Sequence, residues 1–252
     1  MKFRFAAFPL LFILFCLCPA MAAESLDEMD ETFLAARNAT HAGDRARLER
    51  LAGKLRTHEL AVYVDYWRLQ LDLKGDLDPA AVMAFLAANE GDCLAEKVRG
   101  DWLKQLGQRR QWSLFDAEYP ALARPDQELA CYALQSRLAR NDASALDEAT
   151  PLWLNLIDPP DSCHPILEAL IVDKRVLAGD VWARIRRLIE NNRLTGARRD
   201  MNYLPRSQTP DAKTALAVTD APLPWLGKTR LTNSRMHREL IALAIARIAR
   251  RD

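Results

Sequence analysis

Apolar residues recur every three or four positions along most of this chain, which is the spacing of one face of an α-helix. The clearest example runs from Gly91 to Leu122. One apolar stripe precedes a break in the helix at Gly107 and the run Gln108 to Gln111, and a second apolar set follows the break and ends before Pro120. The two sets are Leu94, Val98, Trp102 and Leu106, and then Trp112, Leu114, Phe115 and Tyr119. Asp92 can cap the first helix by accepting unpaired backbone N–H groups. This segment predicts a helix pair, and neither helix can bury its stripe alone.

The same pattern covers almost the whole sequence, and no stretch shows the sustained alternation of a strand. Besides the pair above, helices are predicted at residues 26–42, 45–57, 60–73, 79–89, 127–140, 143–156, 165–177, 181–193, 198–204, 212–217 and 235–250. The proline-bearing segment 205–224 is expected to be an irregular connection within one domain.

A two-residue junction recurs between the predicted helices. Its first residue can close one helix in the left-handed conformation, and its Asp can cap the next helix. The junctions are Gly43-Asp44, Gly75-Asp76, Gly91-Asp92, Asn141-Asp142 and Gly179-Asp180. Units follow at varying intervals of about 30 to 40 residues, without a strict tetratricopeptide signature. The sequence therefore predicts an all-α fold, an irregular α-solenoid that is a superhelix of antiparallel helix pairs.

The last predicted helix carries apolar residues on more than one face, and the sequence stops four residues after the last of them. These residues are Leu240, Ile241, Leu243, Ala244, Ile245 and Ile248. Because the end of a solenoid normally presents a polar cap, we expect the array to be truncated at its carboxyl end and able to self-associate through this helix.

The first residues follow a different pattern. Lys2 and Arg4 precede an apolar run at residues 5–17, and Ala20-Met21-Ala22 supplies small residues with the spacing that signal peptidase recognises. The run is shorter than the roughly 20 residues that span a bilayer, so a retained anchor is the weaker alternative. We expect a signal peptide at residues 1–23, a periplasmic domain at 24–252, and no membrane attachment after cleavage.

Charge argues against a nucleic-acid partner. The full chain has 35 Lys and Arg against 34 Asp and Glu, so removal of Lys2 and Arg4 leaves 33 against 34, a net charge of −1. Basic clusters lie at residues 184–187, 198–199 and 247–251. A phosphate-binding stripe normally comes with a strong positive charge, so solvated helix faces are the favoured interpretation.

Three cysteines remain after the predicted cleavage: Cys93, Cys131 and Cys163. In an oxidising compartment, one pair and one leftover thiol are expected. We favour a disulfide between Cys131 and Cys163, because it would tie two neighbouring helix pairs across the Asp158-Pro159-Pro160 turn. Cys93 is then expected to pack as a small buried hydrophobic residue. The alternative is that all three are free, which would give three thiols in the unreduced, denatured protein.

Six tryptophans are spread along the chain. An aromatic ladder can grip sugar rings, but tryptophans in phase with leucines on a helix belong more often to the core. Trp102 is the clearest case, and it is predicted to be a core residue.

No motif indicates catalysis, a cofactor or a metal site. The sequence has no HExxH, no paired Cys-x-x-Cys, no GxSxG and no glycine-rich phosphate loop. The four histidines are scattered, and the acidic residues are better explained as solvated helix faces than as an acid/base pair. We therefore assign no catalytic, cofactor-binding or metal-binding residue.

Six tracts carry a family resemblance. They are VYVDYWRLQLDL at 62–73, GDWLKQLGQRRQWSLFDAEYP at 100–120, ELACYALQSRLARND at 128–142, EATPLWL at 148–154, DVWARIRRLIENNRLTGARRDMNYLP at 180–205 and RELIALAIARIARRD at 238–252. In this order and spacing, the chain resembles the amino-terminal part of the superhelical, U-shaped domain of soluble lytic murein transglycosylases.

The resemblance implies a role in peptidoglycan turnover. Family members cleave glycan strands between N-acetylmuramic acid and N-acetylglucosamine, with one catalytic glutamate in a lysozyme-like domain. The Glu-Ser helix, the Gly-Leu-Met-Gln tract and the Ala-Tyr-Asn tract of that domain are missing here, and the only Glu-Ser pair is Glu24-Ser25 near the predicted mature terminus. The lysozyme-like domain is therefore expected to be absent, and no catalytic residue can be transferred to this chain.

These expectations favour a periplasmic scaffold or non-catalytic remnant that contacts peptidoglycan glycan strands. Two alternatives stay open. The chain can be one half of a split transglycosylase whose catalytic domain is separately encoded, or a helical-repeat module that binds periplasmic proteins and ignores glycan.

Overall fold

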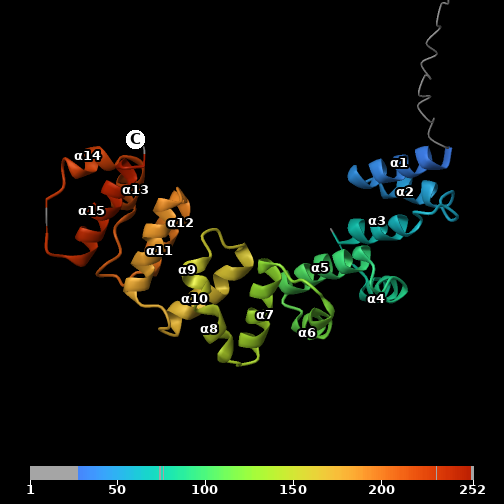
Figure 1. Ribbon diagram of the computed structural model, residues 1–252, viewed down its shortest axis with the longest axis horizontal. Helices are drawn as coiled ribbons and strands as arrows, with labels where there is room; N and C mark the ends of the chain where they lie inside the picture. The colour runs from blue at the N-terminus through green and yellow to red at the C-terminus, as the bar shows by residue number, and fades with distance from the viewer. Residues whose placement is uncertain (1–27, 74, 76, 231, 251–252) are drawn as a thin grey trace, which may run out of the picture. The chain divides into compact units, whose positions relative to one another are not determined.

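The computed structural model describes residues 28–250 apart from residues 74, 76 and 231 (Figure 1). The predicted signal peptide with its cleavage site, the Glu24-Ser25 pair and Asp76 of one predicted junction lie outside the described residues. The chain forms two compact units, which divide between Arg68 and Leu69. Every regular element in the described part of the chain is helical. No helix within it has both the length and the apolar character needed to span a membrane.

The first unit contains a short helix hairpin. Helix α1 (Glu28–His41) and helix α2 (Arg45–Ala52) pack on each other, and α3 (Val62–Asp72) begins in this unit. Gly43 has a φ of 72°, and the Asp44 carboxylate accepts a hydrogen bond of 2.9 Å from the Arg47 backbone N–H. This junction therefore works as the sequence predicted. The helix after it ends at Ala52, five residues before its predicted end at Thr57.

An aromatic cluster lies within the first unit. The Phe33 ring stacks on His58, with ring centroids 5.0 Å apart, and packs on Trp67 at 4.9 Å. His58 Nε2 lies 3.2 Å from an Asp30 carboxylate oxygen. Trp67 is 5% exposed, as expected for a core tryptophan.

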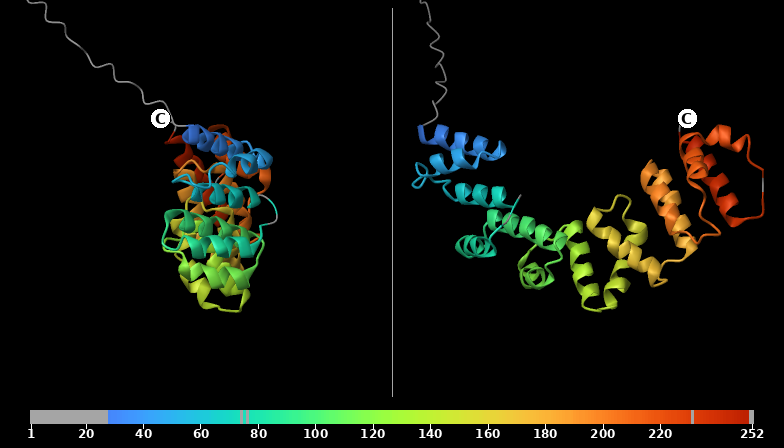
Figure 2. Two further views of the ribbon diagram at one scale, coloured as in Figure 1. Left: turned by 90° about the vertical axis from the view of Figure 1, so that its right-hand side faces the viewer. Right: turned by 180° about the vertical axis from the view of Figure 1, so that it is seen from behind.

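The second unit is a run of short helices, each packed mainly on its neighbours in the sequence. Its elements are α4 (Pro79–Ala88), α5 (Cys93–Gln108), α6 (Trp112–Glu118), η1 (Tyr119–Ala121), α7 (Gln127–Ala139), α8 (Ser144–Ala149), α9 (Leu152–Asn155), η2 (Asp161–Cys163), α10 (His164–Val172), α11 (Ala178–Glu190), α12 (Leu194–Asp200), η3 (Met201–Tyr203), α13 (Ala212–Asp220), α14 (Pro222–Leu226) and α15 (Arg235–Ile248). Helices α13, α14 and α15 pack together at its end (Figure 2, orange to red). This arrangement confirms the predicted all-α solenoid.

The α5–α7 contact shows why Gly107 is a glycine. A Cβ atom built on Gly107 would lie 2.4 Å from the Tyr132 ring, because α7 crosses α5 at this point. Gly107 itself still lies within α5, and the helix ends at Gln108, inside the break predicted at residues 107–111. The turn is made by Arg110, which has a φ of 55°. The Gln111 N–H then bonds back to the Leu106 carbonyl at 2.9 Å and closes the helix.

Left-handed residues close other helices as well. They are Gly43, Gly91, Asn141, Lys174 and Asn192, so with Arg110 the described left-handed residues are two glycines and four residues with side chains. The predicted junction at Gly179-Asp180 is wrong, because both residues lie inside the first turn of α11. The Asp180 carboxylate instead accepts a hydrogen bond of 2.9 Å from the Leu177 backbone N–H, ahead of the helix.

Proline changes two other predicted segments. The expected helix at 143–156 is divided into α8 and α9, and Pro151 stands just before α9. The expected irregular connection at 205–224 contains the whole of α13 and the first residues of α14, with Pro222 as the first residue of the latter helix. Proline is tolerated at that position because the first N–H of a helix has no intrahelical partner.

Large aromatic side chains fill the interior of the second unit. Trp102 and Trp153 are each 1% exposed and Trp182 is 0% exposed, so the predicted core position of Trp102 is confirmed. Trp112 and Trp225 are only partly buried. On the last helix, Leu240, Leu243 and Ala244 are buried, whereas Ile245 is 55% exposed.

Cys131 on α7 and Cys163 at the end of η2 are joined by a disulfide, the pairing favoured from the sequence. The bridge links α7 to the start of α10. Cys93 is free and exposed, so its predicted burial is wrong. It is the first residue of α5, and the helix turns Leu94 and Ala95 toward the core instead.

Candidate functional site: a charged hollow beside α12

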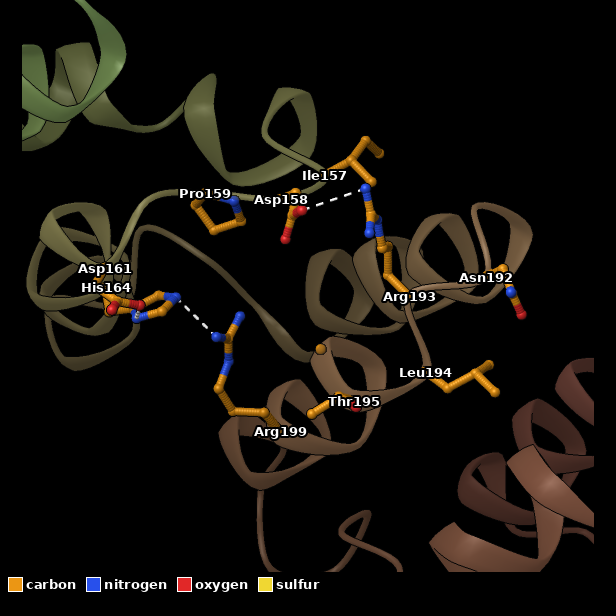
Figure 3. Close-up of a pocket in the computed structure, with 11 residues that line it drawn as sticks. Ile157, Asp158, Pro159, Asp161, His164, Asn192, Arg193, Leu194, Thr195 and Arg199 are labelled. Carbon is orange, nitrogen blue, oxygen red and sulfur yellow. Dashed lines mark hydrogen bonds and ion pairs between the residues drawn. The ribbon is translucent and has the colours of Figure 1, made fainter.

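A hollow of about 350 Å³ lies between the segment that enters α10 and the segment that forms α12 (Figure 3). We call it the Arg199 hollow. Its walls come from the connection between α9 and α10, the start of α10, the connection between α11 and α12, and α12 itself. The lining residues are Ile157, Asp158, Pro159, Asp161, His164, Asn192, Arg193, Leu194, Thr195, Gly196 and Arg199.

A buried ion pair lies next to the hollow. Arg184 Nε donates to Asp200 Oδ2 at 2.7 Å, and the two side chains are 2% and 1% exposed. Arg199 Nε lies 3.1 Å from the other oxygen, Oδ1, of the same carboxylate. Asp200 thus accepts from two guanidinium groups, one in the core and one in the wall of the hollow.

Arg184 is held from several sides. Its Nη1 donates to the carbonyl of Trp153 and, at 2.6 Å, to the carbonyl of Leu156. Its guanidinium carbon lies 5.2 Å from the centroid of the Trp153 ring, within the range of a cation–π contact. Its Nη2 has no hydrogen-bond partner among the described residues. These contacts fasten α11 to α9 and to the chain that follows α9.

The prediction of a solvated face at residues 184–187 is therefore wrong for Arg184. It follows Val181 by three residues and precedes Leu188 by four, so it lies on the face of α11 that enters the core. Arg187, three residues further on, is exposed and donates to the Leu154 carbonyl at 2.7 Å.

His164 and Arg199 meet across the hollow. Arg199 Nη1 lies 2.8 Å from His164 Nε2, and since arginine can only donate, the imidazole nitrogen accepts. Burial lowers the pKa of His164, and the charge on Arg199 lowers it further. The neutral imidazole therefore carries its proton on Nδ1, which lies 3.7 Å from Asp161. The Asp161 side chain is fully exposed.

The upper wall in Figure 3 holds a second ion pair. Arg193 Nη2 lies 3.3 Å from Asp158 Oδ2, with side chains 55% and 71% exposed.

Tyr203 lies outside the wall of the hollow. Its hydroxyl lies 3.4 Å from Glu168, and burial together with the Glu168 charge raises the pKa of Tyr203 to about 12. Tyr203 therefore stays protonated at neutral pH.

The chemistry that this arrangement offers is binding. Guanidinium groups and a threonine hydroxyl supply hydrogen-bond donors, while Asp158 is paired and Asp161 is solvated. Within residues 28–250, excluding the three gaps, no group of three histidine, cysteine or acidic side chains could hold a metal ion. The two residues named from the sequence, Cys131 and Cys163, lie outside the wall of the hollow, although Cys163 directly precedes His164.

Comparison with known proteins adds structural relatives only. No protein-family model matches the sequence, and no curated protein matches it. Solved structures do match. A 70-kDa soluble lytic transglycosylase in complex with bulgecin A aligns with a TM-score of 0.66 at 20% identity. The alignment covers 91% of the present chain and 37% of the transglycosylase chain. The chain has the superhelical fold of the soluble lytic transglycosylases.

Two further structures give the same result. The 70-kDa soluble lytic transglycosylase Slt70 from Escherichia coli aligns with a TM-score of 0.65 at 20% identity, over 91% of this chain and 37% of its own. An inactive mutant of lytic transglycosylase Slt from Pseudomonas aeruginosa aligns with a TM-score of 0.60 at 22% identity. This alignment covers 90% of the present chain and 36% of the transglycosylase. The chain thus spans little more than a third of the length of each transglycosylase that it matches.

Proposed function

We propose that this chain is a murein-associated helical scaffold, which contacts peptidoglycan glycan strands and does not cleave them by itself. The observation that carries the proposal is the alignment of 91% of the chain, at a TM-score of 0.66, with a soluble lytic transglycosylase. The six sequence tracts that resemble the U-shaped domain of that family point in the same direction.

The proposed location is the periplasm. A signal peptide is predicted at residues 1–23. The Cys131–Cys163 disulfide suits an oxidising compartment, where such bonds persist.

The non-catalytic part of the proposal rests on the described side chains. Glycoside cleavage requires a carboxylic acid that can protonate the leaving oxygen, and such an acid has a raised pKa. The described carboxylates whose pKa departs from its usual value are Glu49, Asp126, Asp142 and Asp211, and each is lowered. The Asp200 carboxylate is 1% exposed and already accepts from two guanidinium groups, so it does not face a substrate.

A second candidate function is a share in an active enzyme. The matched transglycosylases are more than twice as long as the aligned region, which favours cooperation with a lysozyme-like domain. A coding sequence for such a domain directly downstream of this gene would support that candidate over the free scaffold.

The test is to incubate the purified chain, beginning at Glu24, with peptidoglycan sacculi. Co-sedimentation measures binding, and mass spectrometry of the supernatant detects released fragments. We expect saturable binding without anhydro-muropeptides, and no binding to chitin as a matched polysaccharide without muramic acid. Released anhydro-muropeptides would show that the chain is catalytic, and absence of co-sedimentation would refute murein association.

A further inference from the structure

We propose that the Arg199 hollow binds a single carboxylate group, with Arg199 as its central hydrogen-bond donor. The first support is the charge balance around Asp200. Arg184 and Arg199 both bond to this one carboxylate, at 2.7 Å and 3.1 Å. Two positive charges thus share one negative charge. The Arg184 side chain is 2% exposed and that of Arg199 is 39% exposed, so of the two guanidinium groups that of Arg199 is the one open to a ligand in the hollow.

The second support is the set of donors left without partners. Arg199 uses Nε for Asp200 and Nη1 for His164. No described residue bonds to its remaining nitrogen, Nη2, or to the hydroxyl of Thr195. The two residues are four apart on α12, which places them on the same face of the helix, and both line the hollow. A guanidinium N–H and a hydroxyl are both donors from which a carboxylate in the hollow can accept.

The acidic residues in the wall limit the charge of the ligand. Asp158 is neutralised by Arg193 at 3.3 Å, and Asp161 points into solvent. These two carboxylates oppose a doubly charged group such as phosphate more strongly than they oppose one carboxylate. His164 is neutral and accepts from Arg199, so it orients the guanidinium and adds no competing charge.

The size of the hollow limits the ligand as well. A volume of about 350 Å³ is at the lower end of the usual range for small-molecule sites. It suits a sugar acid or one or two amino-acid residues. The carboxylate can therefore come from N-acetylmuramic acid or from the carboxyl terminus of a short peptide. Only the sugar source rests on the proposed function; carboxylate binding itself does not.

Two-dimensional NMR titration of the ¹⁵N-labelled chain can test the proposal. The probes are N-acetylmuramic acid, its neutral counterpart N-acetylglucosamine, the peptide Ala-Ala and its carboxyl-terminal amide. We expect saturable shifts of the Thr195 and Gly196 amide signals with at least one carboxylate probe and none with its neutral counterpart. A response to N-acetylmuramic acid alone identifies a sugar acid as the ligand, and a response to Ala-Ala alone identifies a peptide terminus.

Variants separate this site from general charge attraction. Arg199→Gln should lower the affinity for the carboxylate probe by about tenfold or more, because a charge-assisted hydrogen bond is lost. Thr195→Val, at an exposed position where the fold is not at risk, should lower this affinity about threefold. Arg206→Gln removes the same charge at an exposed residue outside the hollow and should change affinity less than twofold.

The inference fails if no carboxylate probe saturates at millimolar concentration, or if Arg199→Gln and Thr195→Val bind as tightly as the parent chain. It also fails if neutral probes bind equally well. Because the readout is small-molecule binding, this result is distinguishable from a failure of sacculus binding, which concerns the proposed function alone.

Discussion

Arg184 Nε lies 2.7 Å from Asp200 Oδ2, and both side chains are enclosed by protein, at 2% and 1% exposure. This pair joins the middle of α11 to the last residue of α12. Through Trp153 and Leu156, Arg184 also reaches the end of α9. One buried cation therefore connects α9, α11 and α12 of the second unit, and Asp200 also bonds to Arg199 in the wall of the hollow.

Removing one member of this pair should destabilise the chain strongly. In Asp200→Asn, the Arg184 charge stays buried without its carboxylate, which typically costs about 3 to 5 kcal/mol. Urea unfolding monitored by circular dichroism gives the free energy of unfolding. The double variant Arg184→Met with Asp200→Leu should be more stable than Asp200→Asn, because no charge remains buried. Arg187→Met on the exposed face of α11 is the control, with an expected change of about 1 kcal/mol or less, because only an exposed hydrogen bond to the Leu154 carbonyl is lost. A near-neutral Asp200→Asn would contradict the prediction.

Glycine-to-alanine changes at two positions of α5 should have opposite signs. In Gly107→Ala the new Cβ would lie 2.4 Å from the Tyr132 ring, so α7 must move, at a cost of about 1 to 3 kcal/mol. In Gly100→Ala the new Cβ would lie 3.9 Å from Leu122 Cδ1, an ordinary contact, so alanine should stabilise the helix by about 0.4 to 1 kcal/mol. Thermal unfolding of both variants checks this. Equal effects would mean that helix propensity alone governs the two sites.

The disulfide predicts both a thiol count and a stability change. The unreduced, denatured chain from Glu24 should show one thiol, from Cys93, and three after reduction. In the native protein Cys93 should react readily with a thiol reagent, because it is exposed. Replacing Cys131 and Cys163 by Ala should cost roughly 3 to 4 kcal/mol in the chain-entropy model for a sequence separation of 32 residues. Cys93→Ala is the control. Three thiols before reduction would show that the bond does not form.

The lowered pKa of His164 predicts a dependence of stability on pH. Its pKa in the folded state lies below the ordinary value of 6.5, mainly because of burial. As the pH falls below that value, the unfolded chain takes up the proton first, so the free energy of unfolding decreases until the folded-state pKa is passed. His164→Gln keeps an acceptor for Arg199 and should reduce this loss. Urea unfolding at pH 7.5 and pH 5.0 for both proteins isolates the contribution, because the other titrating groups are common to them. An identical pH dependence would contradict the prediction.

The helices could be predicted from the sequence because the evidence for them is local. The stripe of Leu94, Val98, Trp102 and Leu106 and the Asp92 cap need only neighbours within a few turns, and the structure contains both. The helix ends were less predictable. Arg110 and Lys174 adopt left-handed conformations that their side chains give no reason to expect.

The hollow could not be predicted from the sequence because it depends on packing between distant segments. His164 and Arg199 are 35 residues apart, and only the packing of successive helices brings them within 2.8 Å. The burial of Arg184 could have been predicted, since the residue occupies a core position in the register of α11. The sequence-based prediction placed it on a solvated face because it is charged. A cation in phase with an apolar stripe is thus a better indication of a buried ion pair than a cluster of basic residues alone.

The disulfide between Cys131 and Cys163 also has a mechanical consequence. If the chain is pulled from its two ends, tension passes from α7 to α10 through the sulfur–sulfur bond. Helices α8 and α9, which lie in the closed loop between the two cysteines, carry none of that load. The α9–α10 connection that supplies Asp158 to the hollow belongs to the same loop. That wall of the hollow is shielded from stretching of the chain by one covalent bond.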